Sequence, residues 1–271
     1  ITGSPRITPK RRSCSDAYIR TTLLFAKSVI LVEGDAELIL IPAMVKKVYG
    51  VSLDELGVSI INIGSTGFQN VARIFHPDRI KKKCAILTDF DESIFDLPDD
   101  PNDDNTEQKD ARNSQIAGER RKTELDDFCI DNEWISPFYA THTFEVELIG
   151  YEENEESICS VVETIYEQEA TINRSKERLK NGDVAIYGKE ILRLANKLKK
   201  GWFAIEIANH LNDEFILPEY IDDALTFVND SINNSLIVKI ACYRLSKLAD
   251  DNSVELLQPN SLTVNIRILA G

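Results

Sequence analysis

Three short apolar runs in the first ninety residues set the predicted architecture. Residues 27–32, 58–63 and 84–88 are almost continuously apolar, which is typical of strands covered on both faces. Asp35 is expected to cap a helix that ends at Gly50, and a second helix is expected around residues 68–75. Alternation of strands and helices implies right-handed crossovers, and therefore an α/β fold with a parallel sheet flanked by helices.

The pattern changes twice after the third run. Residues 97–110 are rich in Asp, Asn and Pro and are expected to form a solvated, mobile loop before a helix from about Ala111 to Ile130. Residues 134–139 and 141–148 are predicted to be extended, the second because its character alternates. Helical periodicity follows Gly150. The predicted domains are a linker over 1–24, an α/β domain over 25–150 and an all-helical domain over 151–271.

Composition narrows the class of protein. The chain has 271 residues, of which 43% are hydrophobic and 28% charged, so wholesale disorder is excluded. Its net charge of −14 repels a polyanion, so any nucleic acid must be met by a local basic patch, a metal site or another domain. The five cysteines form no C-x-x-C pair and indicate reduced thiols in a cytoplasmic protein. No apolar run reaches the roughly 20 residues of a membrane span.

Acidic residues stand where two of the predicted strands end. Glu33 directly follows the first strand and Glu37 lies one helical turn later, while Asp89 and Asp91 end the third strand as D-x-D. Each motif alone is usually a solvated residue or a helix cap. Because the carboxyl ends of parallel strands meet at one edge, where active sites lie, the four carboxylates are expected to share a pocket.

The ligand type indicates the metal. Asp and Glu oxygens without His or Cys favour Mg²⁺ or Mn²⁺ over Zn²⁺. Glu145 and Glu147, on the later alternating segment, could complete a second ion site, although a solvent-facing strand explains them equally well.

These motifs resemble a known pattern. V-E-G-D-A-E at 32–37 followed by T-D-F-D at 88–91 resembles the Toprim domain of topoisomerases, primases and related nucleases. More closely, the chain resembles the C-terminal half of the overcoming lysogenization defect (OLD) family of nucleases. The stretches that carry this resemblance are residues 24–37, I-G-S-T-G-F at 63–68, T-F-E-V-E-L at 143–148 and K-G-W-F-A at 200–204.

The resemblance implies cleavage of DNA by two metal ions, and antiphage defence and repair are both open as its biological role. It assigns Lys200 as a catalytic lysine alongside Glu33 and Asp89, although Lys200 could instead be one of several lysines near a helix end. The implied metal ligands are Glu33, Glu37, Asp89, Asp91, Glu145 and Glu147.

The family also has an N-terminal ATPase that forms dimers. No G-x-x-x-x-G-K-[ST] motif occurs here, so that ATPase, and a homodimer formed through it, are expected to involve residues outside this sequence.

Two other functions fit part of the pattern. A haloacid-dehalogenase-like phosphatase would use D-x-D-x-T, but Ser93 stands at the fifth place and the motif is not on the first strand. A non-catalytic Toprim-like module would bind a partner or nucleic acid and use metal only as a structural clamp.

Overall fold

A parallel sheet of four strands is the centre of the fold in the computed structural model, which describes residues 23, 25–230 and 232–251. The strands are β1 (Ser28–Val32), β2 (Val58–Asn62), β3 (Cys84–Asp89) and β4 (Ile135–Ala140), in the order β2-β1-β3-β4. The predicted parallel α/β architecture is therefore confirmed. The predicted linker over 1–24 lies outside the described residues except for Leu23.

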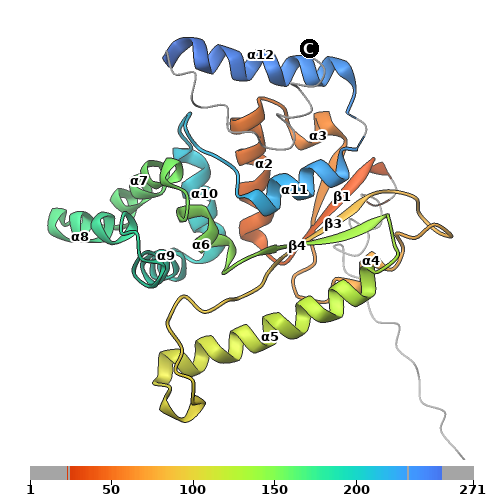
Figure 1. Cartoon of the computed structure of the whole chain (residues 1–271). Coiled ribbons are helices and arrows are strands. Elements are labelled where there is room, and N and C mark those ends of the chain that lie inside the picture. The colour runs from red at the N-terminus through yellow and green to blue at the C-terminus, as the bar shows by residue number, and fades with distance from the viewer. Residues whose placement is uncertain (1–22, 24, 231, 252–271) are drawn as a thin grey trace, which may run out of the picture.

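Both faces of the sheet are covered, and successive residues of β1 serve opposite faces. Val29 and Leu31 belong to a core cluster with residues of α4 (Gln69–Ala72) and α5 (Thr106–Cys129). Ile30 and Val32 belong to a larger cluster on the other face, with α2 (Asp35–Tyr49). Figure 1 shows α5 on one side of the sheet and α2 with α11 on the other. Continuous apolar strands are thus explained by burial on both faces.

The second half of the chain is helical, as predicted. Its elements are η2 (Glu152–Asn154), α7 (Glu155–Ile165), α8 (Glu169–Leu179), α9 (Val184–Leu198), α10 (Lys200–His210), α11 (Glu219–Val228) and α12 (Asn234–Asp251). Helix α10 packs along α2, and α11 packs against β3 and β4. One core cluster therefore contains residues from both sides of position 150, although the domain division itself stays a prediction. No helix in the described residues is both long and apolar enough to span a bilayer.

The segment 141–148 is not extended, and this prediction was wrong. Phe144–Ile149 form helix α6, with Thr143 at its N-cap and Gly150 at its C-cap. The helix is buried almost all round, since Phe144, Val146, Leu148 and Ile149 are each at most 3% exposed. A short helix without a polar face lacks the 3.6-residue pattern, so its alternating letters imitate a strand.

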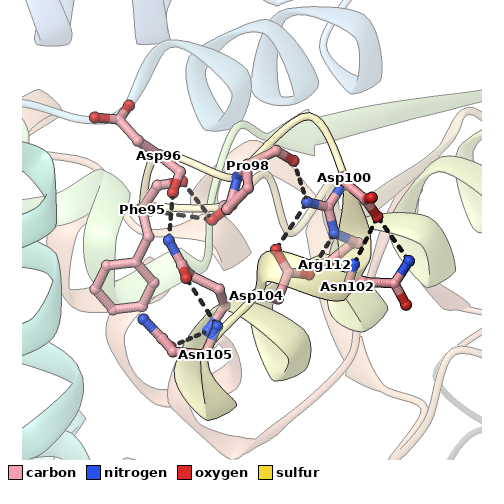
Figure 2. A network of polar contacts seen from close by, with 10 residues as sticks. Phe95, Asp96, Pro98, Asp100, Asn102, Asp104, Asn105 and Arg112 are labelled. Atoms are coloured by element: carbon pink, nitrogen blue, oxygen red, sulfur yellow. Dashed lines mark hydrogen bonds and ion pairs between the residues drawn. The ribbon is translucent and has the colours of Figure 1, made fainter.

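The acidic segment before α5 is more ordered than a solvated loop. Arg112 of α5 donates from Nε to Asp104 Oδ2 at 2.6 Å and from Nη2 to the Pro98 carbonyl at 2.6 Å, as Figure 2 shows. Asp104 is only 6% exposed. The segment contains η1 (Pro101–Asp103), and a capping box starts α5 at Thr106 instead of Ala111. An acidic residue that pairs with an arginine can thus be buried, and composition alone does not show which acidic residues are paired.

The structure differs from the prediction in three smaller features of the connections between strands. Helix α4 is limited to Gln69–Ala72, and an unpredicted short helix, α3 (Leu53–Leu56), precedes β2. Gly34 occupies the N-cap of α2, so Asp35 is the first helical residue and not the cap. Its Oδ1 instead accepts a hydrogen bond from Asn62 Nδ2 at 2.7 Å, which ties the start of α2 to the end of β2.

Gly118 allows α5 to approach the chain that follows β3. A Cβ atom at this position would lie 1.8 Å from the Phe90 carbonyl oxygen and 3.4 Å from Asp91 Cβ. No side chain can be accommodated there unless helix and turn move apart. The absence of a side chain at Gly118 therefore fixes the position of α5 against the D-x-D turn.

Replacing Gly118 with Ala is expected to destabilise the protein by about 1–3 kcal/mol, because the added methyl group overlaps the Phe90 backbone. Inside a helix the same change ordinarily stabilises a protein by about 1 kcal/mol. A decrease in stability would therefore point to the steric overlap. The measurement is urea unfolding. Gly182→Ala, in the turn between α8 and α9, is the control for an added methyl group without overlap, because its Cβ would meet nothing within 4 Å. A Gly118→Ala protein as stable as the native one would contradict the packing described.

Candidate metal centre

Glu33 is anchored to the neighbouring strand. Leu31 of β1 pairs with Ile86 of β3, and extending this register by two residues brings Glu33 opposite Thr88. The Thr88 hydroxyl donates a hydrogen bond to Glu33 Oε1. Thr88 is 3% exposed, so the interaction is shielded from water and holds one carboxylate beside the end of β3.

The D-x-D turn is held by the adjacent strand β4. Asp89 ends β3, and Asp91 has a φ of 60°, in the left-handed region that Asp tolerates better than most residues. The Phe90 amide donates to the Ala140 carbonyl at 2.8 Å, and the Asp91 amide donates to the His142 carbonyl at 3.1 Å. Backbone bonds from outside the turn thus set the positions of both aspartates.

Arg121 of α5 joins this group, and the sequence analysis missed it. Its Nη2 lies 2.7 Å from Asp91 Oδ2 and also donates to the Asp89 backbone carbonyl. Its Nε is 3.9 Å from Glu33 Oε1, within ion-pair distance. The side chain is only 15% exposed. The local sequence E-R-R-K does not show which of its basic residues contacts the acidic cluster. That is decided by the packing of α5.

Glu37, in the first turn of α2, faces the same cluster. Its pKa is raised from 4.5 to about 7, by burial first and then by the negative charges of Glu145 and Glu33, while a backbone hydrogen bond and Lys200 oppose the rise. Burial next to other carboxylates thus disfavours the ionised form of Glu37.

Asp89 is at the centre of the electrostatic cluster. Burial raises its pKa well above the usual value, and the charges of the neighbouring carboxylates raise it further. Those carboxylates are, in decreasing order of effect, Glu145, Glu37, Glu33 and Asp91. Residues from β1, α2, β3 and α6 therefore converge on one position, as expected for the carboxyl edge of a parallel sheet.

Lys200, the first residue of α10, reaches the cluster from the helical half. Its Nζ lies 3.1 Å from Glu145 Oε1 and 3.2 Å from Oε2. Glu145 is almost fully buried, whereas about half of the Lys200 side chain is exposed. Burial disfavours the charged amine, but Glu145, Asp89 and Glu37 outweigh this effect and raise the pKa of Lys200. Lys200 is therefore a charged group at the mouth of the cluster.

The structure also differs from the sequence prediction at Glu147, in its position, and at Tyr220, in its proximity to the cluster. Glu147 is not on a strand face with Glu145; its Oε1 accepts a hydrogen bond from the His142 amide at 3.1 Å, at the start of α6. Tyr220 of α11, which no motif indicated, is close to the cluster. Burial raises the pKa of its phenol well above normal, and Asp89 and Glu37 add to the rise.

The chemistry of this site fits hard divalent cations. Five carboxylates are accompanied by the two cationic side chains of Arg121 and Lys200, so acidic groups outnumber cationic ones. All the donors are oxygens, the ligands that Mg²⁺ and Mn²⁺ prefer. With the side chains as they stand, no three Asp, Glu, His or Cys residues in the described ranges are arranged as a ligand set for one ion. The carboxylates are Glu33, Glu37, Asp89, Asp91 and Glu145.

Comparison with known proteins supports the resemblance found in the sequence. Residues 24–91 match the family model of the Toprim domain of overcoming lysogenization defect protein-like sequences. This match is a quarter of the chain, but it contains Glu33, Glu37, Asp89 and Asp91. No curated protein sequence matches the chain.

Solved structures extend the similarity beyond the matched domain. The C-terminal region of the Burkholderia pseudomallei OLD protein is 25% identical, with a TM-score of 0.59 over 76% of this chain and 98% of that one. The C-terminal region of the Xanthomonas campestris pv. campestris OLD protein has the same fold, at 23% identity and a TM-score of 0.52, over 83% of this chain and 99% of that one. Residues 24–91 are therefore an OLD-like Toprim domain, and the chain is built like the C-terminal region of an OLD-family protein.

Proposed function

We propose that this protein is a nuclease that hydrolyses phosphodiester bonds in DNA with two Mg²⁺ or Mn²⁺ ions. The observation that carries the proposal is the convergence of five carboxylates from four elements on Asp89, with Lys200 at the mouth. The Toprim match over residues 24–91, which contains four of the five carboxylates, supports nucleic-acid chemistry at this cluster. DNA as the substrate is drawn from the family resemblance.

The ions would be held by the clustered carboxylates. Among them, Asp91 pairs with Arg121 of α5 and Glu145 pairs with Lys200 of α10. Glu147 accepts a hydrogen bond from the His142 amide through Oε1, so it would contribute to an ion site through its other oxygen. When bound, divalent ions lower the pKa of an attacking water and neutralise the leaving oxygen of the phosphodiester.

Lys200 would complement charge that develops on the phosphate. Its ammonium group is held by Glu145 but remains about half exposed, so a phosphate oxygen could approach it from solvent. Fixed positive charge aimed at the reacting phosphate stabilises the transition state more than the ground state. The chain also needs such local positive charge, because its net charge of −14 repels DNA.

Asp89→Asn is expected to lower Mn²⁺-dependent nicking of supercoiled plasmid by at least about 100-fold, because it removes the central carboxylate. Lys200→Ala is expected to lower nicking by about 100- to 1000-fold, the loss typical of one group that stabilises transition-state charge. Mn²⁺ binding, measured by calorimetry, should be weakened by the first change and largely retained in the second.

The control is Lys197→Ala, which removes the same charge at a lysine that packs over the Tyr166 ring. Its nicking rate should equal that of the native protein. Full activity of the Asp89→Asn protein would disprove the proposal. Tight Mn²⁺ binding without any nicking by the native protein would instead favour the non-catalytic, metal-clamped module.

A second prediction concerns stability without metal. Because the pKa of Glu37 is higher in the folded protein than in the unfolded chain, protonation of Glu37 favours folding. This contribution is fully present below pH 4.5 and is lost as pH rises toward and past about 7. In the presence of a chelator, the melting temperature should therefore fall between about pH 4.5 and 7, and less so for Glu37→Gln. Millimolar Mn²⁺ should flatten the native curve. An identical pH response of both proteins would contradict the prediction.

A further inference from the structure

We propose that the guanidinium group of Arg121 is a built-in counter-ion for Glu33 and Asp91, which a divalent metal must displace when it binds. The inference rests on the proposed function, since it takes both carboxylates to be metal ligands. Arg121 would then influence metal affinity from α5, a helix that carries none of the proposed ligands.

The geometry places the guanidinium between the two carboxylates. Nη2 is 2.7 Å from Asp91 Oδ2, and Nε is 3.9 Å from Glu33 Oε1. An ion coordinated by these oxygens needs the same space. It would also be repelled by the positive charge of Arg121, and the repulsion is strong because the arginine is mostly buried. Arginine and metal are therefore alternative partners of the same oxygens.

The position of Arg121 is set by the fold. Gly118 lies one helical turn before it and permits the close approach of α5 to the D-x-D turn. Nη2 also donates to the Asp89 carbonyl, so the side chain is tied to the backbone as well as to a carboxylate. Neighbouring Arg120 differs in each respect: it is 77% exposed and pairs only loosely, at 3.8 Å, with Glu124 across one turn of α5.

The contacts of Arg121 are incomplete, which suits a partner that can be displaced. Its Nε is buried, yet it has no hydrogen-bond partner among the residues that the structure describes. Its interaction with Glu33 is therefore an ion pair without a hydrogen bond. Direct coordination of Glu33 and Asp91 by an ion would replace one weak and one strong contact.

The test is calorimetric titration of Mn²⁺ into the intact chain and two matched variants. Arg121→Gln should bind Mn²⁺ roughly tenfold more tightly, because the competing charge is gone. Arg120→Gln, which removes the same charge at an exposed position on the same helix, should leave the affinity unchanged. The rise in melting temperature caused by Mn²⁺ should likewise be larger for Arg121→Gln than for the native protein.

A second variant covers the case in which Arg121→Gln folds poorly, since it leaves two partly buried carboxylates without a counter-ion. In Arg121→Ala, the missing side chain leaves room for a free guanidinium ion. Millimolar guanidinium chloride should weaken Mn²⁺ binding to this variant competitively, whereas equal sodium chloride should not. The native protein, which already holds its own guanidinium, should respond equally to both salts.

The outcomes separate this inference from the proposed function. Unchanged or weaker Mn²⁺ binding by Arg121→Gln, with no guanidinium effect on Arg121→Ala, would show that Arg121 only positions Asp91 and would overturn the inference alone. Absence of Mn²⁺ binding by the native protein and by Arg121→Gln would overturn the proposed metal centre, and the inference with it.

Discussion

Burial of carboxylates beside one another at one edge of the sheet is the constraint on which the rest of the candidate site depends, since burial first and mutual repulsion second oppose their ionisation. The rise in the pKa of Glu37 from 4.5 to about 7 corresponds to about 3 kcal/mol against its ionised form, on an order-of-magnitude scale. The pKa of Asp89 is shifted in the same direction, by burial first and then by the neighbouring carboxylates. The fold bears this cost because the strands and helices that carry the acids pack into the two core clusters. Packing energy therefore maintains an arrangement that electrostatics alone would disperse.

Two cations offset part of the repulsion, and they differ in how they are held. Arg121 is mostly buried and tied to a backbone carbonyl, whereas Lys200 is about half exposed and pairs with Glu145. A guanidinium presents several donors in a fixed plane, while an ammonium is a compact charge on a flexible chain. The difference suits different tasks: Arg121 can fill space between carboxylates, and Lys200 can turn toward a ligand that arrives from solvent.

The sequence predicted the sheet and most of the acidic cluster because both depend on local patterns. Buried parallel strands read as apolar runs, and Glu33, Glu37, Asp89 and Asp91 follow those runs directly. Lys200 came from the family resemblance. Thr88, Arg121 and Tyr220 were missed, because their roles depend on register and helix packing between distant parts of the chain. Helix α6 was misread because a helix buried all round shows no helical period.

The helical half of the chain is part of the site and not an appendage to it. Helix α10 brings Lys200 to Glu145, and α11 brings Tyr220 to the edge where Asp89 lies, while both helices share a core with the sheet. On the opposite face, α5 supplies Arg121 through the close approach at Gly118. The carboxylates are thus flanked by groups from two separate layers. Because each layer is anchored in a different core cluster, a shift of either one would alter the charge balance around Asp89 without changing any acidic residue.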